Sequence, residues 1–310
     1  MQKPARKGRW LRRILRIFLS FLILFIIACF VFDHYYQFRR SDEELKQFYS
    51  DNHIKATISY YETQGRKLRY VSVGDEEGKG TLVFLHGSPG SMSFYSGRFR
   101  DKDILDKFHI YAVDRPGYGY SGFGDPEPSI QKQSEMIRDL IDSLHHAKHP
   151  VIVVGSSFGA AIACRLAMDH PDLVDGLVLT GPAIGPGMEK YFWFTHVIES
   201  PLIRWFIPRM FRSANTEKVH HKEELEKMLP LWKNIRVPVA YLQGEKDELV
   251  DTANAGFARQ HLINAPYLDI QFVKRRGHRL AKFEWPRFKE EIWKVYERVK
   301  KSSGRLNSLN

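Results

Sequence analysis

The stretch Val151-Ile152-Val153-Val154-Gly155-Ser156-Ser157-Phe158-Gly159 decides the fold of this chain. Its apolar first half predicts a buried strand, and the following residues 160–168 have the pattern of a helix. Gly155 and Gly159 have no Cβ, so a sharp turn can bring that helix close to the strand. A serine at such a turn lies in a strained backbone conformation at a helix N-terminus. This context predicts Ser157 as a nucleophile, with a Gly/Ser connection that carries no chemistry as the alternative.

A serine hydroxyl needs a base and an acceptor that holds the base in one tautomer. His278 follows the apolar run 268–273 and is the predicted base. Asp247 follows the run 239–242 and is the predicted acid, while Glu245 and Glu248 remain open as alternatives because either side chain can orient an imidazole. In chain order the candidates are therefore serine, acid and histidine, each just past a predicted strand.

The second donor to an oxyanion is expected from the loop that follows another predicted strand, residues 81–85. That loop is His86-Gly87-Ser88-Pro89-Gly90, in which the glycine permits a tight turn and the proline holds the loop shape. The N–H groups of Ser88 and Phe158 are the predicted oxyanion donors.

These motifs resemble the α/β-hydrolase superfamily, in its branch of esterases, lipases and peptidases, over about residues 55 to 300. Residues 114–121 (Asp-Arg-Pro-Gly-Tyr-Gly-Tyr-Ser) are a further mark of that branch, and we assign them mainly a structural turn. The resemblance implies transfer of an acyl group to water through an acyl-serine. Epoxide hydrolases and haloalkane dehalogenases of this fold are expected to carry Asp where this chain has Ser157.

Three alternatives to ester hydrolysis stay open. An acyltransferase or a C–C bond hydrolase would use the same triad. A ligand receptor on the same fold would keep the pocket without turnover. In each case the ligand is expected to be a small acyl compound.

The order of predicted elements indicates an α/β fold with a mostly parallel, doubly wound sheet of about eight strands. Strand-like runs alternate with helical stretches through one domain, residues 55–301, and the first two runs are expected to pair antiparallel. The predicted strands are residues 54–61, 67–73, 81–85, 109–113, 151–154, 177–180, 239–242 and 268–273.

A helical cap is expected at about residues 181–236, because this connection is too long for a simple crossover. It is rich in aromatic residues, which could line a pocket for an apolar acyl chain, touch a membrane or form the core of the cap. The apolar and aromatic residues concerned are Tyr191, Phe192, Trp193, Phe194, Trp205, Phe206, Met210 and Phe211.

The N-terminus predicts a membrane anchor. Residues 1–16 carry seven basic and no acidic residues, and an apolar segment at 17–35 follows, long enough for a span if Arg16 extends toward the surface. The positive-inside bias places the N-terminus in the cytoplasm and the catalytic domain on the other side of the membrane. These charges account for most of the net charge of +11, so a nucleic-acid partner is not predicted. Residues 36–54 are expected to be a juxtamembrane linker or helix and residues 302–310 a frayed tail.

Two other fates of the N-terminal segment stay open. Ile26-Ile27-Ala28-Cys29 resembles a bacterial lipobox, in which Cys29 would be lipidated after cleavage, and a secretory signal would be removed altogether. The apolar run continues past Cys29, which favours a plain span.

The remaining histidines and cysteines suggest no further site. No metal or cofactor is predicted, because no cluster has metal-ligand spacing and no glycine loop fits a phosphate. Cys164 is expected to be a small buried residue, and no disulfide with Cys29 is expected. Histidines in charged stretches are expected at the surface, namely His145, His146, His149, His220 and His221.

Overall fold

One eight-stranded sheet forms the centre of the computed structural model, which describes residues 6–143, 149–191, 193 and 195–307. The strand order is β1-β2-β4-β3-β5-β6-β7-β8, with β1–β2 and β2–β4 antiparallel and the other pairs parallel. The predicted mostly parallel sheet is confirmed. The strands are β1 (Ala56–Thr63), β2 (Arg66–Gly74), β3 (Gly80–Leu85), β4 (Phe108–Val113), β5 (Val151–Ser156), β6 (Gly176–Thr180), β7 (Val239–Gly244) and β8 (Leu268–Val273).

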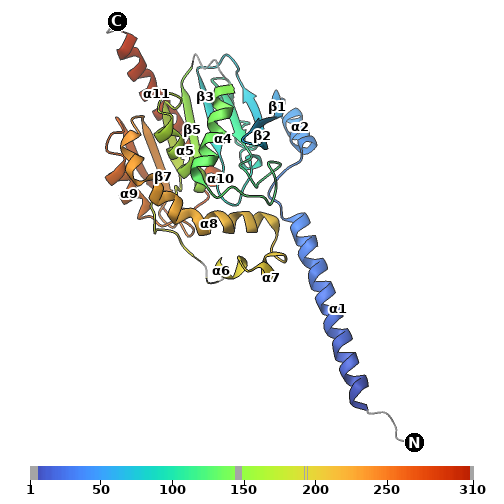
Figure 1. Cartoon of the computed structure of the whole chain (residues 1–310). Helices are drawn as coiled ribbons and strands as arrows, with labels where there is room; N and C mark the ends of the chain where they lie inside the picture. Colours follow the sequence, from blue (N-terminus) through green and yellow to red (C-terminus); the bar gives the residue numbers. More distant parts are fainter. Residues whose placement is uncertain (1–5, 144–148, 192, 194, 308–310) are drawn as a thin grey trace, which may run out of the picture.

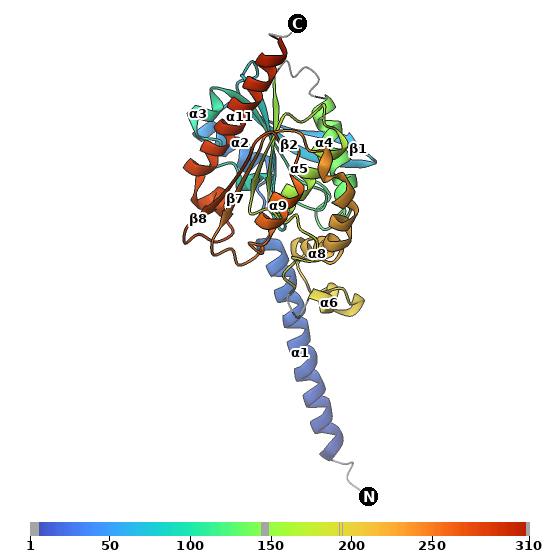
Figure 2. The same ribbon diagram turned by 90° about the vertical axis from the view of Figure 1, so that its left-hand side faces the viewer.

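Helices cover both faces of this sheet (Figure 1, Figure 2). Helices α4, α5 and α9 pack on one face, and α2, α3, α10 and α11 pack on the other. Their bounds are α2 (Asp42–Asp51), α3 (Lys102–Leu105), α4 (Ile130–Ser143), α5 (Phe158–Asp169), α9 (Asn254–His261), α10 (Leu280–Phe283) and α11 (Trp285–Asn307). A short 3-10 helix, η1 (Met92–Phe94), follows β3.

Strand β3 shows why both faces must be covered. Val83 and Leu85 belong to the hydrophobic cluster with α4 and α5, whereas Leu82 and Phe84 belong to the cluster with α2 and α11. Successive side chains of a strand point to opposite faces, so a continuous apolar run is stable only between two helical layers. Polar chemistry is therefore left to the loops at the ends of the strands.

Between β6 and β7 the chain forms the helical cap. It consists of α6 (Thr195–Ile198), α7 (Pro201–Arg204), α8 (Arg209–Met228) and the 3-10 helix η2 (Leu229–Asn234). Among its aromatic residues, Trp193 and Trp205 are 86% and 78% exposed, while the predicted Phe192 and Phe194 lie outside the described residues.

Helix α1 (Arg6–Tyr35) projects from the end of the domain where the cap lies (Figure 1). Its segment Trp10–Tyr35 has a mean hydropathy of 2.9 in its most apolar window and buries none of it. By length and composition this helix could span a membrane, and a signal sequence fits the same description.

Contacts at Phe25 and Asp33 join α1 to the cap. The rings of Phe25 and Phe206 lie 5.8 Å apart, and the Nε of Arg209 donates to Asp33 at 2.9 Å. The cap and the apolar helix are therefore neighbours in the structure.

Of the linker or helix expected at residues 36–54, the structure contains a helix, whereas the tail expected at residues 302–310 differs. Helix α2 begins at a capping box formed by Ser41 and Glu44, and it buries Leu45 and Tyr49 against the sheet, so part of residues 36–54 packs onto the domain. At the other end α11 runs through Ser302 to Asn307, whereas a tail was expected there; residues 308–310 lie outside the described part. Both helices carry an apolar stripe toward the core, which stabilises them beyond what their polar composition suggests.

Candidate active site

Ser157 lies at the sharp turn between β5 and α5. Its φ of 54° and ψ of −120° are strained for a residue with a side chain. A Cβ on Gly155 would lie 2.6 Å from the Cα of Ala160, and one on Gly159 would collide with the carbonyl oxygens of Leu85 and His86. The two glycines therefore let α5 approach the sheet closely enough to hold the strained turn.

His278 and Asp247 face each other on the loops after β8 and β7. The imidazole Nδ1 lies 2.9 Å and 3.0 Å from the two carboxylate oxygens. Both side chains pack over Gly181, the residue that follows β6, where an added Cβ would lie 3.0 Å from the imidazole. Because Gly181 also has a φ of 51°, only a glycine fits beneath this pair without strain.

The three neighbouring carboxylates have different partners. Asp247 meets the imidazole, while Glu248 accepts from the backbone N–H of His278 at 3.2 Å. Glu245 accepts from the backbone N–H of Arg275. Of the alternatives left open by the sequence, only Asp247 holds the ring.

The Asp247 carboxylate is stabilised in its charged form. Its burial alone would raise the pKa, but the hydrogen bond and charge of His278 and the N–H groups of Val250 and Leu249 lower the pKa below its ordinary value. An ionised Asp247 fixes the proton of His278 on Nδ1 and leaves Nε2 as the basic nitrogen.

Ser157 approaches this pair from β5. Its N–H donates to the carbonyl of Thr180 at 2.9 Å, directly before Gly181, on which the imidazole packs. Within the described part of the chain, Ser157 Oγ makes no hydrogen bond to His278. Such bonds commonly tighten only in the complex with substrate.

The two predicted oxyanion donors belong to segments next to Ser157. Phe158 is the first residue of α5, so its N–H has no acceptor within the helix. Ser88 belongs to the loop of residues 86–90, which we call the oxyanion loop, and an added Cβ on Gly87 would lie 2.9 Å from the Cβ of Ser157. The oxyanion loop thus packs directly against the nucleophile.

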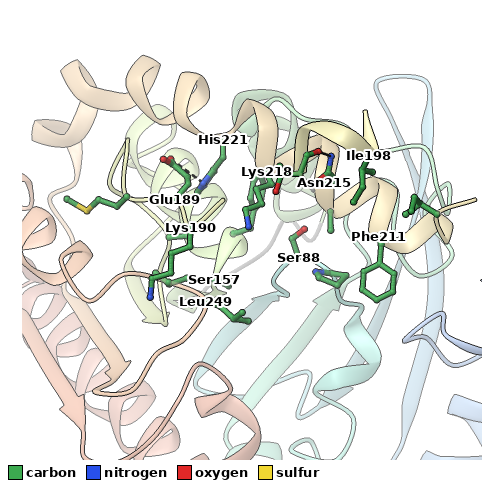
Figure 3. A pocket seen from close by; sticks show the side chains of 18 of the residues that line it. Ser88, Ser157, Glu189, Lys190, Ile198, Phe211, Asn215, Lys218, His221 and Leu249 are labelled. Carbon is green, nitrogen blue, oxygen red and sulfur yellow. Dashed lines mark hydrogen bonds and ion pairs between the residues drawn. The ribbon is translucent and has the colours of Figure 1, made fainter. Parts of the chain in front are cut away.

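A cavity of about 670 Å³ connects this site to the cap. Figure 3 shows Ser88 and Ser157 at the cavity together with Phe211 and Lys218 of the cap. Its lining is mainly apolar and includes Met188, Val197, Ile198, Ile203, Ile207, Phe211, Leu249 and Val250. The cavity has the size and lining of a site for a small apolar ligand.

His221 contradicts the expectation of a surface histidine. It is buried in the cavity wall, its ring lies 4.9 Å from that of Phe158, and its Nδ1 lies 3.6 Å from Glu189 (Figure 3). Burial lowers the pKa of His221 to about 4, so the ring is neutral at physiological pH. The charged residues next to it in the sequence lie on the outer face of α8, whereas His221 lies on the inner face. Of the other four, His220 is exposed, His149 is half-buried, and His145 and His146 lie outside the described residues.

The motif at residues 114–121 does more than build a turn. Arg115 and Tyr118 are fully buried and contact Glu217 of α8, and the hydrogen bonds join residues 102 and 99 positions apart. No local sequence pattern predicts Glu217 as the partner of Arg115 and Tyr118, so it could not be identified from the sequence.

Comparison with known proteins identifies relatives of part of the chain. The chain is 33% identical to "Epoxide hydrolase 1" of Caenorhabditis elegans over 144 residues, which make up 45% of this chain and 34% of that protein. A "1-acylglycerol-3-phosphate O-acyltransferase" of Arabidopsis thaliana is 30% identical over 135 residues, 41% of this chain and 31% of that protein. The matches span about a third of the length of these curated relatives.

Solved structures share the fold more completely. A bacterial membrane phospholipase A superposes with a TM-score of 0.62 at 15% identity, covering 95% of this chain and 99% of the other. The model of the alpha/beta hydrolase family matches residues 82–285, which include the predicted nucleophile, both predicted oxyanion donors, and the predicted acid and base. With this match and the eight-stranded sheet, the chain belongs to the alpha/beta hydrolase family.

Proposed function

We propose that this chain is a membrane-anchored serine hydrolase that cleaves a carboxylic ester or a related acyl bond. Ser157 attacks the acyl carbon, and His278 takes its proton and passes it to the leaving group. The N–H groups of Ser88 and Phe158 stabilise the oxyanion, and water then releases the acyl group from Ser157.

One observation carries this proposal: the imidazole–carboxylate pair packs on Gly181, the residue after Thr180, whose carbonyl accepts from the N–H of the strained Ser157, and Ser157 lines an apolar cavity. A serine, rather than an aspartate, at this turn favours acyl transfer over epoxide opening. The positions of His278, Asp247 and the two N–H donors fit the roles of base, acid and oxyanion hole that acyl transfer requires.

The substrate is proposed to be an apolar acyl compound taken up at a membrane. The cavity is lined mainly by aliphatic and aromatic side chains, and exposed Trp193, Leu202 and Trp205 lie on the cap, which contacts α1. The basic residues before the apolar helix favour a cytoplasmic N-terminus and a catalytic domain on the other side of the membrane.

Reaction with a fluorophosphonate probe tests the nucleophile. A serine activated by His278 attacks the phosphorus and displaces fluoride, and the adduct resembles the tetrahedral intermediate. We expect stoichiometric labelling that maps to Ser157 and is absent in Ser157→Ala and His278→Ala.

Ser156 supplies the matched control, because its hydroxyl bonds to Thr180 and Tyr95 rather than to a base. Ser156→Ala should keep the labelling. Probe attachment that persists in Ser157→Ala, or a folded protein that never reacts, would refute the hydrolase and leave a ligand receptor on this fold. Esters of increasing acyl length, tested on the reactive protein, would then define the substrate.

An acyltransferase is the second candidate, because a relative of part of the chain bears that name. It would use the same acyl-serine and pass the acyl group to an alcohol instead of water. Product analysis with a glycerol-based acceptor separates the two, since a transferase yields acylated acceptor in excess over free acid. A C–C bond hydrolase would instead cleave a diketone and leave esters intact.

A further inference from the structure

A buried polar network connects the cap to the oxyanion loop. Glu217 of α8 forms an ion pair with Arg115, with Nη1–Oε1 at 2.6 Å and Nη2–Oε2 at 3.2 Å. Both side chains are fully buried. Gln133 of α4 donates to the same carboxylate at 2.9 Å, so the cap contributes the one negative charge of a network otherwise built by the core.

Arg115 also donates from Nη1 to the side-chain oxygen of Gln133 at 2.8 Å, and its other donors bind the oxyanion loop. Its Nε donates to the carbonyl of His86 at 2.8 Å, and its Nη2 donates to the carbonyl of Gly87 at 3.1 Å. The backbone N–H of Arg115 donates to Nε2 of His86, so the proton of that ring is on Nδ1, 2.7 Å from the Gly87 carbonyl. Two donors therefore hold the Gly87 carbonyl on the Arg115 side.

The geometry of the peptide unit transmits this restraint to the site. The carbonyl of Gly87 and the N–H of Ser88 belong to one planar peptide and point in opposite directions when it is trans. With the carbonyl held by Arg115 and His86, the direction of the Ser88 N–H is fixed as well, in a peptide whose Gly87 packs against Ser157. Arg115 therefore orients a predicted oxyanion donor without touching the substrate.

Tyr118 provides a second connection from Glu217. Its hydroxyl donates to Oε2 of Glu217 at 2.7 Å and lies 2.7 Å from the hydroxyl of Ser88. Since the tyrosine has a single proton and gives it to the carboxylate, Ser88 is the donor to Tyr118. The side chain of Ser88 is thus held by the same carboxylate that holds Arg115.

We infer that Glu217 is a positioning residue for the oxyanion hole, through which docking of the cap fixes the peptide between Gly87 and Ser88. This inference rests on the proposed hydrolase function. If α8 moves away, Arg115 loses its buried counter-charge and Tyr118 its acceptor, and both restraints on the oxyanion loop weaken together. The cap thereby contributes to catalysis as well as to the cavity wall.

Glu224→Gln is the matched control for Glu217→Gln. Glu224 lies on the same helix, is similarly buried and also bonds to the core, but its hydrogen bonds go to the N–H of Ile130 and to Lys227 instead of to Arg115 and Tyr118. The test uses an ester that the wild type hydrolyses. Glu217→Gln should lower kcat by about 10²-fold and change KM by less than about twofold, because a misplaced donor stabilises the transition state less well. Glu224→Gln should leave both close to the wild type.

Tyr118→Phe tests the connection itself and retains the ion pair. Alone, this substitution should lower kcat by about tenfold. In the Glu217→Gln background it should lower kcat by a clearly smaller factor, since both substitutions act on Ser88. In the Glu224→Gln background, Tyr118→Phe should lower kcat by the same factor as it does in the wild type. If Glu217→Gln fails to fold, the kcat of Tyr118→Phe decides, and wild-type kcat in that variant overturns the inference.

Equal kcat losses in Glu217→Gln and Glu224→Gln, or independent effects of Glu217 and Tyr118, would reduce Glu217 to a structural role. Failure of the proposed function gives a different result, because the wild-type chain itself would then neither hydrolyse esters nor react with the fluorophosphonate probe.

Discussion

At the scale of single residues, the position of Asp247 separates it from its two acidic neighbours. Three carboxylates lie within four positions, yet one meets the imidazole and the other two meet backbone N–H groups. The turn after β7 directs the short side chain of Asp247 toward the ring, and the N–H groups of Leu249 and Val250 hold its Oδ1. The loop thus pre-orients the carboxylate before any substrate binds.

Replacing this carboxylate gives a sharp prediction. Asp247→Asn should reduce kcat by about 10⁴-fold, because the amide no longer fixes the tautomer of His278, while thermal unfolding shows a folded protein. Steady-state kinetics with an ester substrate measures the effect.

Glu248→Gln is the control, since its amide oxygen can still accept from the N–H of His278. It should keep kcat within a few-fold of the wild type. The opposite ranking of the two variants would make Glu248 the acid.

The residues of the site differ in how far sequence alone could find them. Ser157, Asp247 and His278 each follow an apolar strand, and parallel strands end at one edge, so local patterns indicate a common location. Glu217 and His221 lack such a signal, because their environment depends on how the cap folds back over the core. Sequence reasoning therefore named the residues at strand ends and missed those that α8 brings in.

At the scale of elements, α2 shows how a polar segment can belong to the core. Only Leu45 and Tyr49 of its ten residues are buried, four positions apart on one face. Strands were easier to predict, because their apolar runs are continuous, whereas an amphipathic helix of three turns shows only a few apolar positions.

Leu45→Ala tests whether α2 is part of the folded domain. We expect the free energy of unfolding to fall by about 2–5 kcal/mol, because the substitution leaves a cavity among tightly packed residues. Denaturant unfolding measures the change, and Lys46→Ala at an exposed position should have almost none. An unchanged stability in Leu45→Ala would restore the interpretation of this segment as a linker.

At the scale of the whole molecule, α1 and the cap lie at one end of the domain and the C-terminus of α11 at the other (Figure 1). Removal of residues 1–35 should convert the proposed membrane-anchored protein into a soluble one that keeps α2 and the site, because these residues include the helix that is long and apolar enough to span a membrane. Fractionation after a high-salt wash, followed by probe labelling of both forms, measures this.

The mature N-terminus distinguishes the three proposed fates of the anchor. An uncleaved span retains the basic residues, a lipoprotein begins at a modified Cys29, and a cleaved signal leaves a soluble chain. Full-length protein that remains soluble would contradict the anchor.

The spread of the network along the chain also has a consequence for biosynthesis. Synthesis proceeds from the N-terminus, so α1 and the serine turn exist before Glu217, and His278 comes near the end. In a nascent chain that ends before the cap, Arg115 lacks the counter-charge of Glu217 and the predicted base has not been made. If the proposed function holds, activity is therefore expected only once the last third of the polypeptide has folded onto the first.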